Sequence, residues 1–476
     1  MADPPDTRRI LLPHADVTVE RCVILGDASG AFARAYRLRN PVATLEQVND
    51  VSTAQDRAKV QRVAHAAGLD LVICHRPVTP DDLVFLHPLM APTGQVRCYD
   101  TAAAQSVFEQ QGWHIVTTSP VGTGFVYYVS PQPIQTAPLK IQTYGLQTQH
   151  DAMVQVRLAR PLVALQGTGR ANVRLDIQTA ATPIPTQQDV AWFYRVHLVT
   201  AERANAFARA GGLLVLDIDD HPGYLPNHVK NDYLTIRGVH AVTVSTPKLA
   251  DVIRQWTPHV HVFPNALLQM PPPRVGRSDP RVHLVYAALN RTADWQAQCR
   301  DMLPYLHTHR DRFRATVLHD AQVAQDLSGV IDTKFQELTK YEDYLALLQT
   351  ADVMLMPLLD NEFNAVKSDL KLVETLASGA VALVSPAVRG LTDIPDRYFL
   401  VAQTPADWVV GLDDLAASRD ALQAMGDQGR AYIAQNRLLR HQAHARLDIF
   451  TQLRATLPML ETDRQTRLRD WAQRQG

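Results

Sequence analysis

The sequence predicts an α/β protein with parallel sheets, divided into several domains. Short apolar strands alternate with helical stretches along almost the whole chain, which is the pattern of layered α/β folds. The 476 residues, 46% of them hydrophobic and 20% charged, are enough for two to four domains that each bury a core. The proline-rich stretch "MPPPRVGRSDP", which lacks any periodicity, indicates the clearest domain boundary.

Composition and charge exclude several classes of protein. A formal net charge of -1 gives no general attraction to nucleic acid or to an acidic membrane. Cys22, Cys74, Cys98 and Cys299 are far apart and form no CxxC pair, so they indicate buried thiols of a reducing cytoplasm. No apolar stretch approaches 18 residues, and the N-terminal segment has no long apolar core. We therefore expect neither a transmembrane segment nor secretion.

The first block, residues 1–135, reads as a Rossmann-like α/β unit. Its predicted strands are "RCVILGD", "LDLVICH", "GQVRCYD", "GWHIVTTS" and "TGFVYYVS". Helical segments such as "DDLVFLHPLM" and "TAAAQSVFEQQG" lie between them. The following passage, "SPQPIQTAPLKIQTYGLQTQH", is polar and contains prolines, and it is predicted to be a linker or a crossing segment.

Two further blocks and a tail complete the predicted organisation. The second block, residues 136–275, offers the strands "VRLDIQTA", "DVAWFYRVHL", "GLLVLDIDD", "AVTVST" and "VHVFPN". The third block, residues 276–455, offers "RVHLVYAAL", "FRATVLHD", "DVMLMP" and "AVALVSP". From Trp408 onward the chain is charged, rich in alanine and predominantly helical, and residues 456–476 are expected to form a separate helical tail.

The stretch "FNAVKSDLKLVETLASGAVALVS", residues 363–385, carries the most information about function. Read as a helix with Ser368 as its N-cap and Gly379 at its end, it has an apolar face and an opposite polar face. The apolar face holds Leu370, Val373, Leu376 and Ala377, and the polar face holds Lys367, Lys371, Glu374 and Ser378. Such a helix starts at the carboxyl edge of a parallel sheet, where its amides and two lysines would bind a phosphate. The alternative is a solvated helix face with an ordinary Lys–Glu pair.

Other polar residues follow predicted strands of the second and third blocks. Asp217, Asp219, Asp220 and His221 end one strand and could bind a metal, accept a proton, hold a sugar hydroxyl or cap a turn. Thr246 is predicted as a helix N-cap, and Asn265 as a turn residue or a substrate contact. Asn290, Arg291 and Thr292 fall in a strand–helix loop where a diphosphate would bind, unless Arg291 is simply a surface residue. No GxGxxG, GxSxG, HExxH or P-loop motif occurs, so a dinucleotide dehydrogenase has little support.

Taken in order, these motifs resemble bacterial GT-B glycosyltransferases of the group-1, family-4-like kind. The resemblance covers about residues 140 to 440 and is carried most specifically by the last motif, which is similar to the signature FNxxKSxxKxxExxAxG. It implies a GT-B architecture of two facing Rossmann-like domains, here with an extra N-terminal Rossmann-like α/β domain. In such enzymes the carboxyl-terminal domain binds a nucleotide-sugar and the amino-terminal domain holds most of the acceptor.

The resemblance also implies roles for individual residues. Glu374 would bind the ribose, Lys367 and Ser368 would face the sugar or diphosphate, and Lys371 and Arg291 would add positive charge. The base would rest near Lys334 and Phe335. The complete donor set is Asn290, Arg291, Lys334, Phe335, Asn364, Lys367, Ser368, Asp369, Lys371 and Glu374. Asp219, Thr246 and Asn265 would lie on the acceptor side, and Asp220, His221, Arg291 and Lys367 are the catalytic candidates.

The sequence departs from the family pattern in two places. Val366 stands where the family has an acidic residue eight positions before the ribose glutamate, which affects the grip on the donor sugar. The usual glycine after the first strand of the third block is replaced by "AAL", which affects close approach of the diphosphate.

The resemblance implies glycosyl transfer with retention from a UDP-, GDP- or dTDP-sugar to a glycan, a lipid-linked or a protein acceptor. Lysine and arginine can serve the phosphates, so we expect no metal and no other cofactor. We expect a cytoplasmic enzyme that builds a surface polysaccharide or glycoconjugate, with peripheral membrane contact left open. Two alternatives are a non-catalytic GT-B-like binding or scaffold protein and a nucleotide-sugar 2-epimerase. The epimerases usually begin their first strand almost at the N-terminus, which the extra block contradicts.

The first block resembles the later half of a class I methyltransferase domain. Its "ILGDASGAF" lacks the acidic and glycine pattern of a cofactor loop, so we expect a degenerate, non-catalytic appendage that recognises the acceptor or assists assembly.

Overall fold

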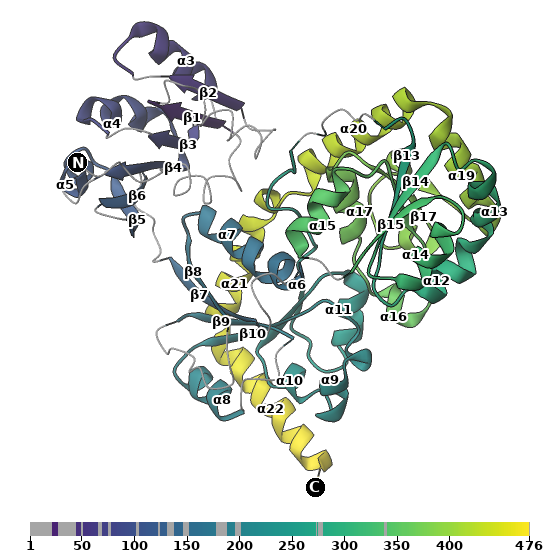
Figure 1. Ribbon diagram of the computed structural model, residues 1–476. Helices are drawn as coiled ribbons and strands as arrows, with labels where there is room; N and C mark the ends of the chain where they lie inside the picture. The colour runs from purple at the N-terminus through teal and green to yellow at the C-terminus, as the bar shows by residue number, and fades with distance from the viewer. Residues whose placement is uncertain are drawn as a thin grey trace.

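The computed structural model divides the chain into three α/β domains, each with one six-stranded sheet (Figure 1). The predicted α/β class with parallel sheets is confirmed. The structure describes residues 21–26, 44–48, 51–64, 69–74, 78–100, 104–121, 124–130, 138–145, 152–177, 188–195, 201–272, 274, 279–337 and 340–475. Apart from Gly26, the "GDASGA" stretch lies outside the described residues.

The first domain forms a mixed sheet of strand order β2-β1-β3-β4-β6-β5, in which β6 runs antiparallel to both of its neighbours. Its strands are β1 (Arg21–Leu25), β2 (Thr44–Val48), β3 (Leu69–Cys74), β4 (Met90–Asp100), β5 (His114–Val121) and β6 (Gly124–Ser130). Its helices are α3 (Ala54–Ala64), α4 (Pro80–Leu86) and α5 (Ala104–Gln110). The sequence predicted all of these strands except β2.

The second domain forms a fully parallel sheet of order β12-β11-β10-β9-β7-β8. Its strands are β7 (Leu139–Gly145), β8 (Ala171–Ile177), β9 (Val190–Tyr194), β10 (Leu213–Ile218), β11 (Ala241–Val244) and β12 (Val260–Val262). Its helices are α6 (Ala152–Val154), a π-helical turn (Gln155–Ala159), α7 (Arg160–Gly167), α8 (Ala201–Arg209), α9 (Pro226–Lys230), α10 (Leu234–Arg237) and α11 (Pro247–Ile253). The prediction of a linker or crossing segment was wrong for the residues of β7, because this polar strand pairs with a neighbouring strand on each side.

The third domain forms a parallel sheet of order β15-β14-β13-β16-β17-β18. Its strands are β13 (Val282–Ala287), β14 (Phe313–Leu318), β15 (Asp332–Gln336), β16 (Val353–Met356), β17 (Val381–Val384) and β18 (Leu400–Val401). Its helices are α12 (Thr292–Gln298), α13 (Leu303–Thr308), α14 (Ala321–Ser328), α15 (Tyr341–Leu348), α16 (Glu362–Ala365), α17 (Leu370–Ala377), α18 (Pro386–Arg389), α19 (Pro405–Ala417) and α20 (Arg419–Asn436). The sheet order reverses between β13 and β16, and in open parallel sheets ligands bind at such a reversal.

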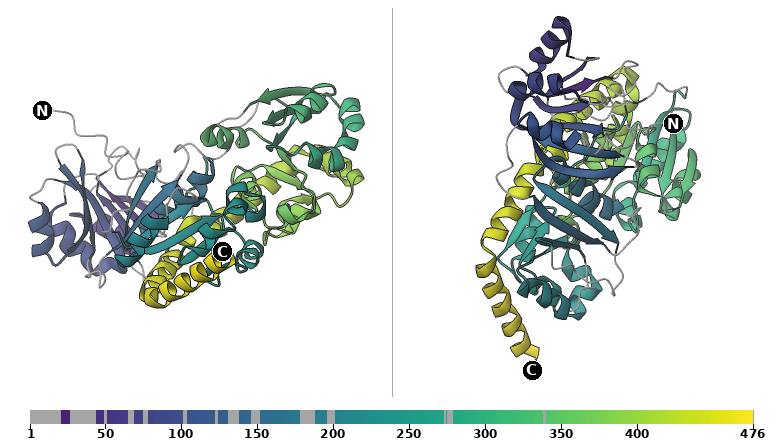
Figure 2. Two further views of the ribbon diagram at one scale, coloured as in Figure 1. Left: turned by 90° about the horizontal axis from the view of Figure 1, so that it is seen from below. Right: turned by 90° about the vertical axis from the view of Figure 1, so that its left-hand side faces the viewer.

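The last two helices return to the second domain, along which they run in both views of Figure 2. They are α21 (Ala443–Ala455) and α22 (Leu457–Gln475). Phe450 of α21 lies edge-on against Trp192 and Phe263, with ring centroids 5.3 and 5.6 Å apart. Helix α21 therefore packs into the core of the second domain, although the sequence assigned residues up to 455 to the third block.

The four cysteines are buried thiols, as the sequence indicated. Among the helices of the described residues, none is long and apolar enough to cross a membrane.

Candidate active site

A cavity of about 350 Å³ lies between the second and third domains. The second domain lines it with Met153, Arg195, Asp219 and Asp220. The third domain contributes the ends of β13 and β16, the start of α17 and part of the segment after β17. The cavity therefore opens at the reversal of strand order in the third sheet, where a nucleotide-sugar was expected.

Helix α17 brings the predicted lysines to this cavity, although its cap and its faces differ from the prediction. The N-cap is Asp369 and not Ser368, and the Asp369 side chain makes no capping hydrogen bond. The Ser368 hydroxyl accepts a hydrogen bond from the Asn265 amide. Gly379 follows the helix with φ +74°, as expected for the residue after a C-cap. Glu374 and Ser378, which were predicted on the polar face, are buried, and α15 covers Glu374 through the hydroxyls of Tyr341 and Tyr344.

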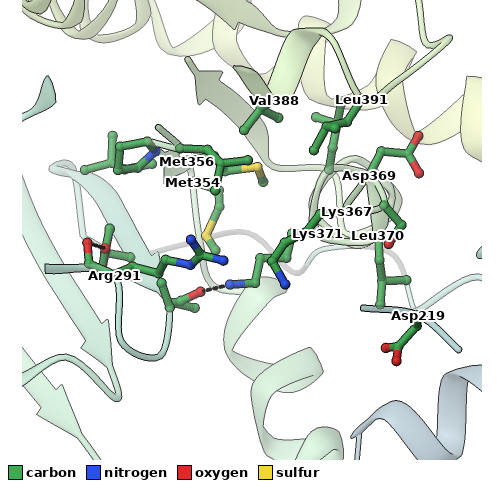
Figure 3. A pocket seen from close by; sticks show the side chains of 18 of the residues that line it. Asp219, Arg291, Met354, Met356, Lys367, Asp369, Leu370, Lys371, Val388 and Leu391 are labelled. Atoms are coloured by element: carbon green, nitrogen blue, oxygen red, sulfur yellow. Dashed lines mark hydrogen bonds between the residues drawn. The ribbon is translucent and has the colours of Figure 1, made fainter. Parts of the chain in front are cut away.

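Lys371 and Arg291 direct two positive charges into the same part of the cavity (Figure 3). The Lys371 ammonium donates to the carbonyl of Ala287 at the end of β13, 2.6 Å away. Lys371 as a residue is exposed, but protein atoms crowd around its ammonium, and this desolvation, followed by the nearby charge of Arg291, lowers the pKa of Lys371 to about 8. Arg291 donates to the side-chain oxygen of Asn364 at 2.7 Å.

Lys367 joins the two domains through a carboxylate. Its ammonium lies 2.6 Å from Asp220 and 4.2 Å from the centre of the Phe363 ring. Asp220 is also paired with Arg195, whose guanidinium in turn contacts Asp219 at 2.7 Å. Burial acts to raise the pKa of Asp220, but the charges of Lys367 and Arg195 outweigh it, so this carboxyl has a lowered pKa. For Asp219 burial prevails and raises the pKa.

Two predicted acceptor-side residues also bridge the domains. The Thr246 hydroxyl caps α11, as predicted, and donates to the carbonyl of Val366 at 2.8 Å. Asn265 donates to Ser368 at 2.8 Å and accepts from the buried guanidinium of Arg157 at 2.7 Å. These contacts fix the loop before α17 against the carboxyl edge of the second sheet.

Glu374 lies outside the cavity lining, in the core between α15 and α17. Its two carboxylate oxygens accept hydrogen bonds from the hydroxyls of Tyr341 and Tyr344. Burial raises the pKa of Glu374 although both hydroxyls act to lower it. A ribose would therefore have to share or replace these tyrosine contacts, and the ribose role stays a prediction.

The remaining candidates lie outside the cavity or are engaged by the protein. Asp369 reaches the cavity, but its oxygens accept from Arg437 and Thr392, at 2.7 Å each. His221 is buried, accepts from the amide of Gly223 and lies 3.4 Å from Glu362. Asn290, which has φ +57°, is exposed and lies outside the cavity lining. Lys334 and Phe335 on the edge strand β15 are also exposed and outside the lining.

Sequence reasoning missed Arg195 and Met153. Arg195 directly follows the buried strand β9, and its φ of +49° is uncommon for a residue with a side chain. A charged residue at the end of an apolar strand was the available signal, because it places the guanidinium at the carboxyl edge of the sheet.

Among the residues that the structure describes, no group of three or more His, Cys, Asp or Glu side chains could hold a metal ion. The aspartates near the cavity are instead paired with Arg195 and Lys367.

Comparison with known proteins gives a family match for part of the chain. Residues 298–449, which cover most of the third domain and the start of α21, match the family described as Glycosyl transferase-like, so this part of the chain is glycosyltransferase-like. No curated protein gives a significant match.

Solved structures give distant likenesses. One is Anabaena HepE in complex with UDP-glucose, at 12% identity and a TM-score of 0.45, covering 67% of this chain and 100% of that one. Another is the α,α-trehalose 6-phosphate synthase of Burkholderia multivorans, at 11% identity and a TM-score of 0.46, covering 67% and 99%. Because these TM-scores are low, the description of the fold depends on the strand orders of the three sheets and not on these likenesses.

Proposed function

We propose that this protein is a glycosyltransferase that moves a sugar from a nucleotide-diphosphate sugar to a glycan, lipid-linked or protein acceptor in the cytoplasm. One observation carries the proposal. Lys371 and Arg291 converge where the strand order of the third sheet reverses. Among its described contacts, the Lys371 ammonium donates a hydrogen bond to the Ala287 carbonyl and not to a carboxylate.

Two like charges held together in a partly desolvated cavity repel each other, and a bound anion relieves that repulsion. A diphosphate supplies the required charge in the required place. During transfer the leaving diphosphate gains negative charge, and cations already in position stabilise it without further rearrangement. Because Arg291, Lys367 and Lys371 offer three such cations, we propose a metal-independent reaction. Retention of the anomeric configuration is proposed from the resemblance of the sequence motifs alone.

The second domain supplies the acceptor side of this proposal. Asp219, Asp220 and Arg195 line the cavity opposite α17. When a diphosphate takes the Lys367 ammonium, Asp220 is released from that ion pair and can accept a hydrogen bond from an acceptor hydroxyl.

A second candidate, a binding protein without catalysis, is favoured by Val366. This side chain, where the family has an acid, is buried among the apolar residues of the second domain. It offers no polar contact to a donor sugar.

A thermal-shift screen against UDP, GDP, dTDP, CMP and their sugars tests the proposal. We expect one nucleotide series to raise the melting temperature, and Lys367→Ala and Glu374→Ala each to abolish the shift. Glu374→Gln is the matched control for folding, because its amide can keep hydrogen bonds to the two tyrosines. Turnover that persists in a chelator supports the metal-independent reaction, whereas strict dependence on manganese rejects it. Binding without hydrolysis or transfer of any donor would favour the non-catalytic alternative.

Donor affinity is expected to depend on pH through Lys371. Because the pKa of Lys371 is about 8, its side chain carries a positive charge below pH 8 and loses that charge above pH 8. Affinity for the nucleotide diphosphate should therefore be constant below pH 8 and fall by up to about tenfold per unit above it. In Lys371→Arg the guanidinium stays charged, so the decline should move to higher pH. Calorimetric titrations from pH 7 to 9.5 measure both, and an identical decline in the two proteins would contradict the assignment.

A further inference from the structure

One side of the cavity is apolar, and its position suggests which part of the donor it contacts. We call this surface the apolar wall, and it is formed by Met354, Met356, Leu358, Val388 and Leu391. The wall is built from the end of β16 and from the segment after β17. Figure 3 shows Met354, Met356, Val388 and Leu391 on the same side of the pocket, near the two lysines. Met354, Met356 and Val388 belong to the hydrophobic core of the third domain, so the wall is held rigidly from behind.

The wall lies on the β16–β17 side of the reversal in strand order, whereas the predicted base site around Lys334 lies on the β14–β15 side. The cations of Arg291 and Lys371 lie at the reversal itself. A diphosphate bound there has its nucleoside on one side and its sugar on the other. With the base toward β15, the sugar is directed to the apolar wall and to the carboxylates of the second domain.

The polar groups next to the wall are already engaged within the protein. The amide of Leu358 donates to the Ser385 hydroxyl at 3.0 Å, and its carbonyl accepts from the same hydroxyl and from Gln298. The amide of Leu359 donates to Asp294 at 2.6 Å. Asp369 accepts a hydrogen bond from Arg437 through one carboxylate oxygen and from Thr392 through the other. A hydroxyl pressed against this wall would lose its water without finding a hydrogen-bond partner among the five apolar side chains that form it.

We propose that the donor carries a deoxysugar, with hydrogen or methyl in place of the hydroxyl that would face the apolar wall. This inference rests on the proposed function and adds its substrate class. The opposite edge of the sugar keeps its hydroxyls, because Asp219, Asp220 and Arg195 line the cavity on that side. An apolar site that must accept an extra hydroxyl discriminates against it by about 10- to 100-fold.

Binding can be measured without knowing the acceptor. The nucleotide that gives the largest thermal shift is prepared as its glucoside and as the 3-, 4- and 6-deoxy counterparts, and each Kd is measured by calorimetry with the full-length protein. We expect one deoxy donor to bind at least about tenfold more tightly than the glucoside. Equal affinity for all four donors, or tighter binding of the N-acetylglucosamine donor than of every deoxy donor, would overturn the inference.

Two isosteric variants connect this preference to the wall. Val388→Thr and Leu391→Asn add a polar atom at nearly unchanged volume and should reduce the preference for the deoxy donor, whereas Val388→Ile and Leu391→Met should retain it. A preference unaffected by both polar variants would assign it to another surface. A different outcome, in which no nucleotide-sugar binds at all, would contradict the glycosyltransferase proposal itself.

Discussion

Replacing Lys371 with alanine is expected to lower turnover of the nucleotide-sugar on the order of a hundredfold or more, because a preorganised cation at the leaving diphosphate is lost. The free energy of unfolding should not fall in parallel. Desolvation and Arg291 make the Lys371 charge unfavourable in the folded protein, as its lowered pKa shows. Steady-state kinetics and urea denaturation of the same variant separate the two effects.

Two matched variants sharpen this prediction. Lys371→Arg keeps the charge and should retain much of the activity below pH 8. Lys140→Ala removes an exposed lysine at the start of β7 and should leave kcat and KM unchanged. A Lys371→Ala enzyme with normal kcat would remove this lysine from the proposed chemistry.

Replacing Asp217 with alanine is expected to lower the free energy of unfolding of the second domain by about 3–5 kcal/mol. Arg157, presented by a π-helical turn, donates to both oxygens of Asp217 at 2.8 and 2.7 Å, and both side chains are almost completely buried. Without the carboxylate, the Arg157 charge stays buried and uncompensated. The midpoint of the urea transition reported by the second domain measures the loss.

The matched control is Asp448→Ala, which breaks a surface pair with Arg170 whose side chains are 52% and 33% exposed. Its expected effect is below about 1 kcal/mol, because exposed ion pairs are well solvated when broken. A similar loss in both variants would contradict the buried-pair account. Since Arg157 also holds Asn265 against the loop of Ser368, Asp217→Ala should weaken nucleotide binding as well.

The elements that the sequence predicted well have strong apolar patterns. Strands β10, β13 and β17 are buried along their whole length, so their apolar runs were visible. Strand β15 was not predicted because it is an exposed edge strand with no apolar alternation. Strand β7 was missed because its neighbours in the sequence are rich in proline, although its own backbone pairs on both sides.

The surroundings of the candidate residues could be predicted only in part. Lys367 and Lys371 were placed at the mouth of the third sheet from helix spacing and from the strand–loop–helix order, and they line the cavity. The same spacing placed Glu374 on the polar face with these lysines, but Glu374 is buried, because two tyrosines from α15 cover that face of α17. Helical periodicity describes one helix, and it contains no information about which neighbours pack on it.

The sequence by itself determined the α/β class, the strands with buried apolar runs and the positions of the lysines at one helix start, because these depend on local periodicity. Only the tertiary structure decided that Asp220 pairs with Lys367, that Arg195 faces the cavity and that α21 returns to the second domain. These are contacts between segments far apart in the chain, and they form where packing of whole domains brings opposite charges or apolar faces together.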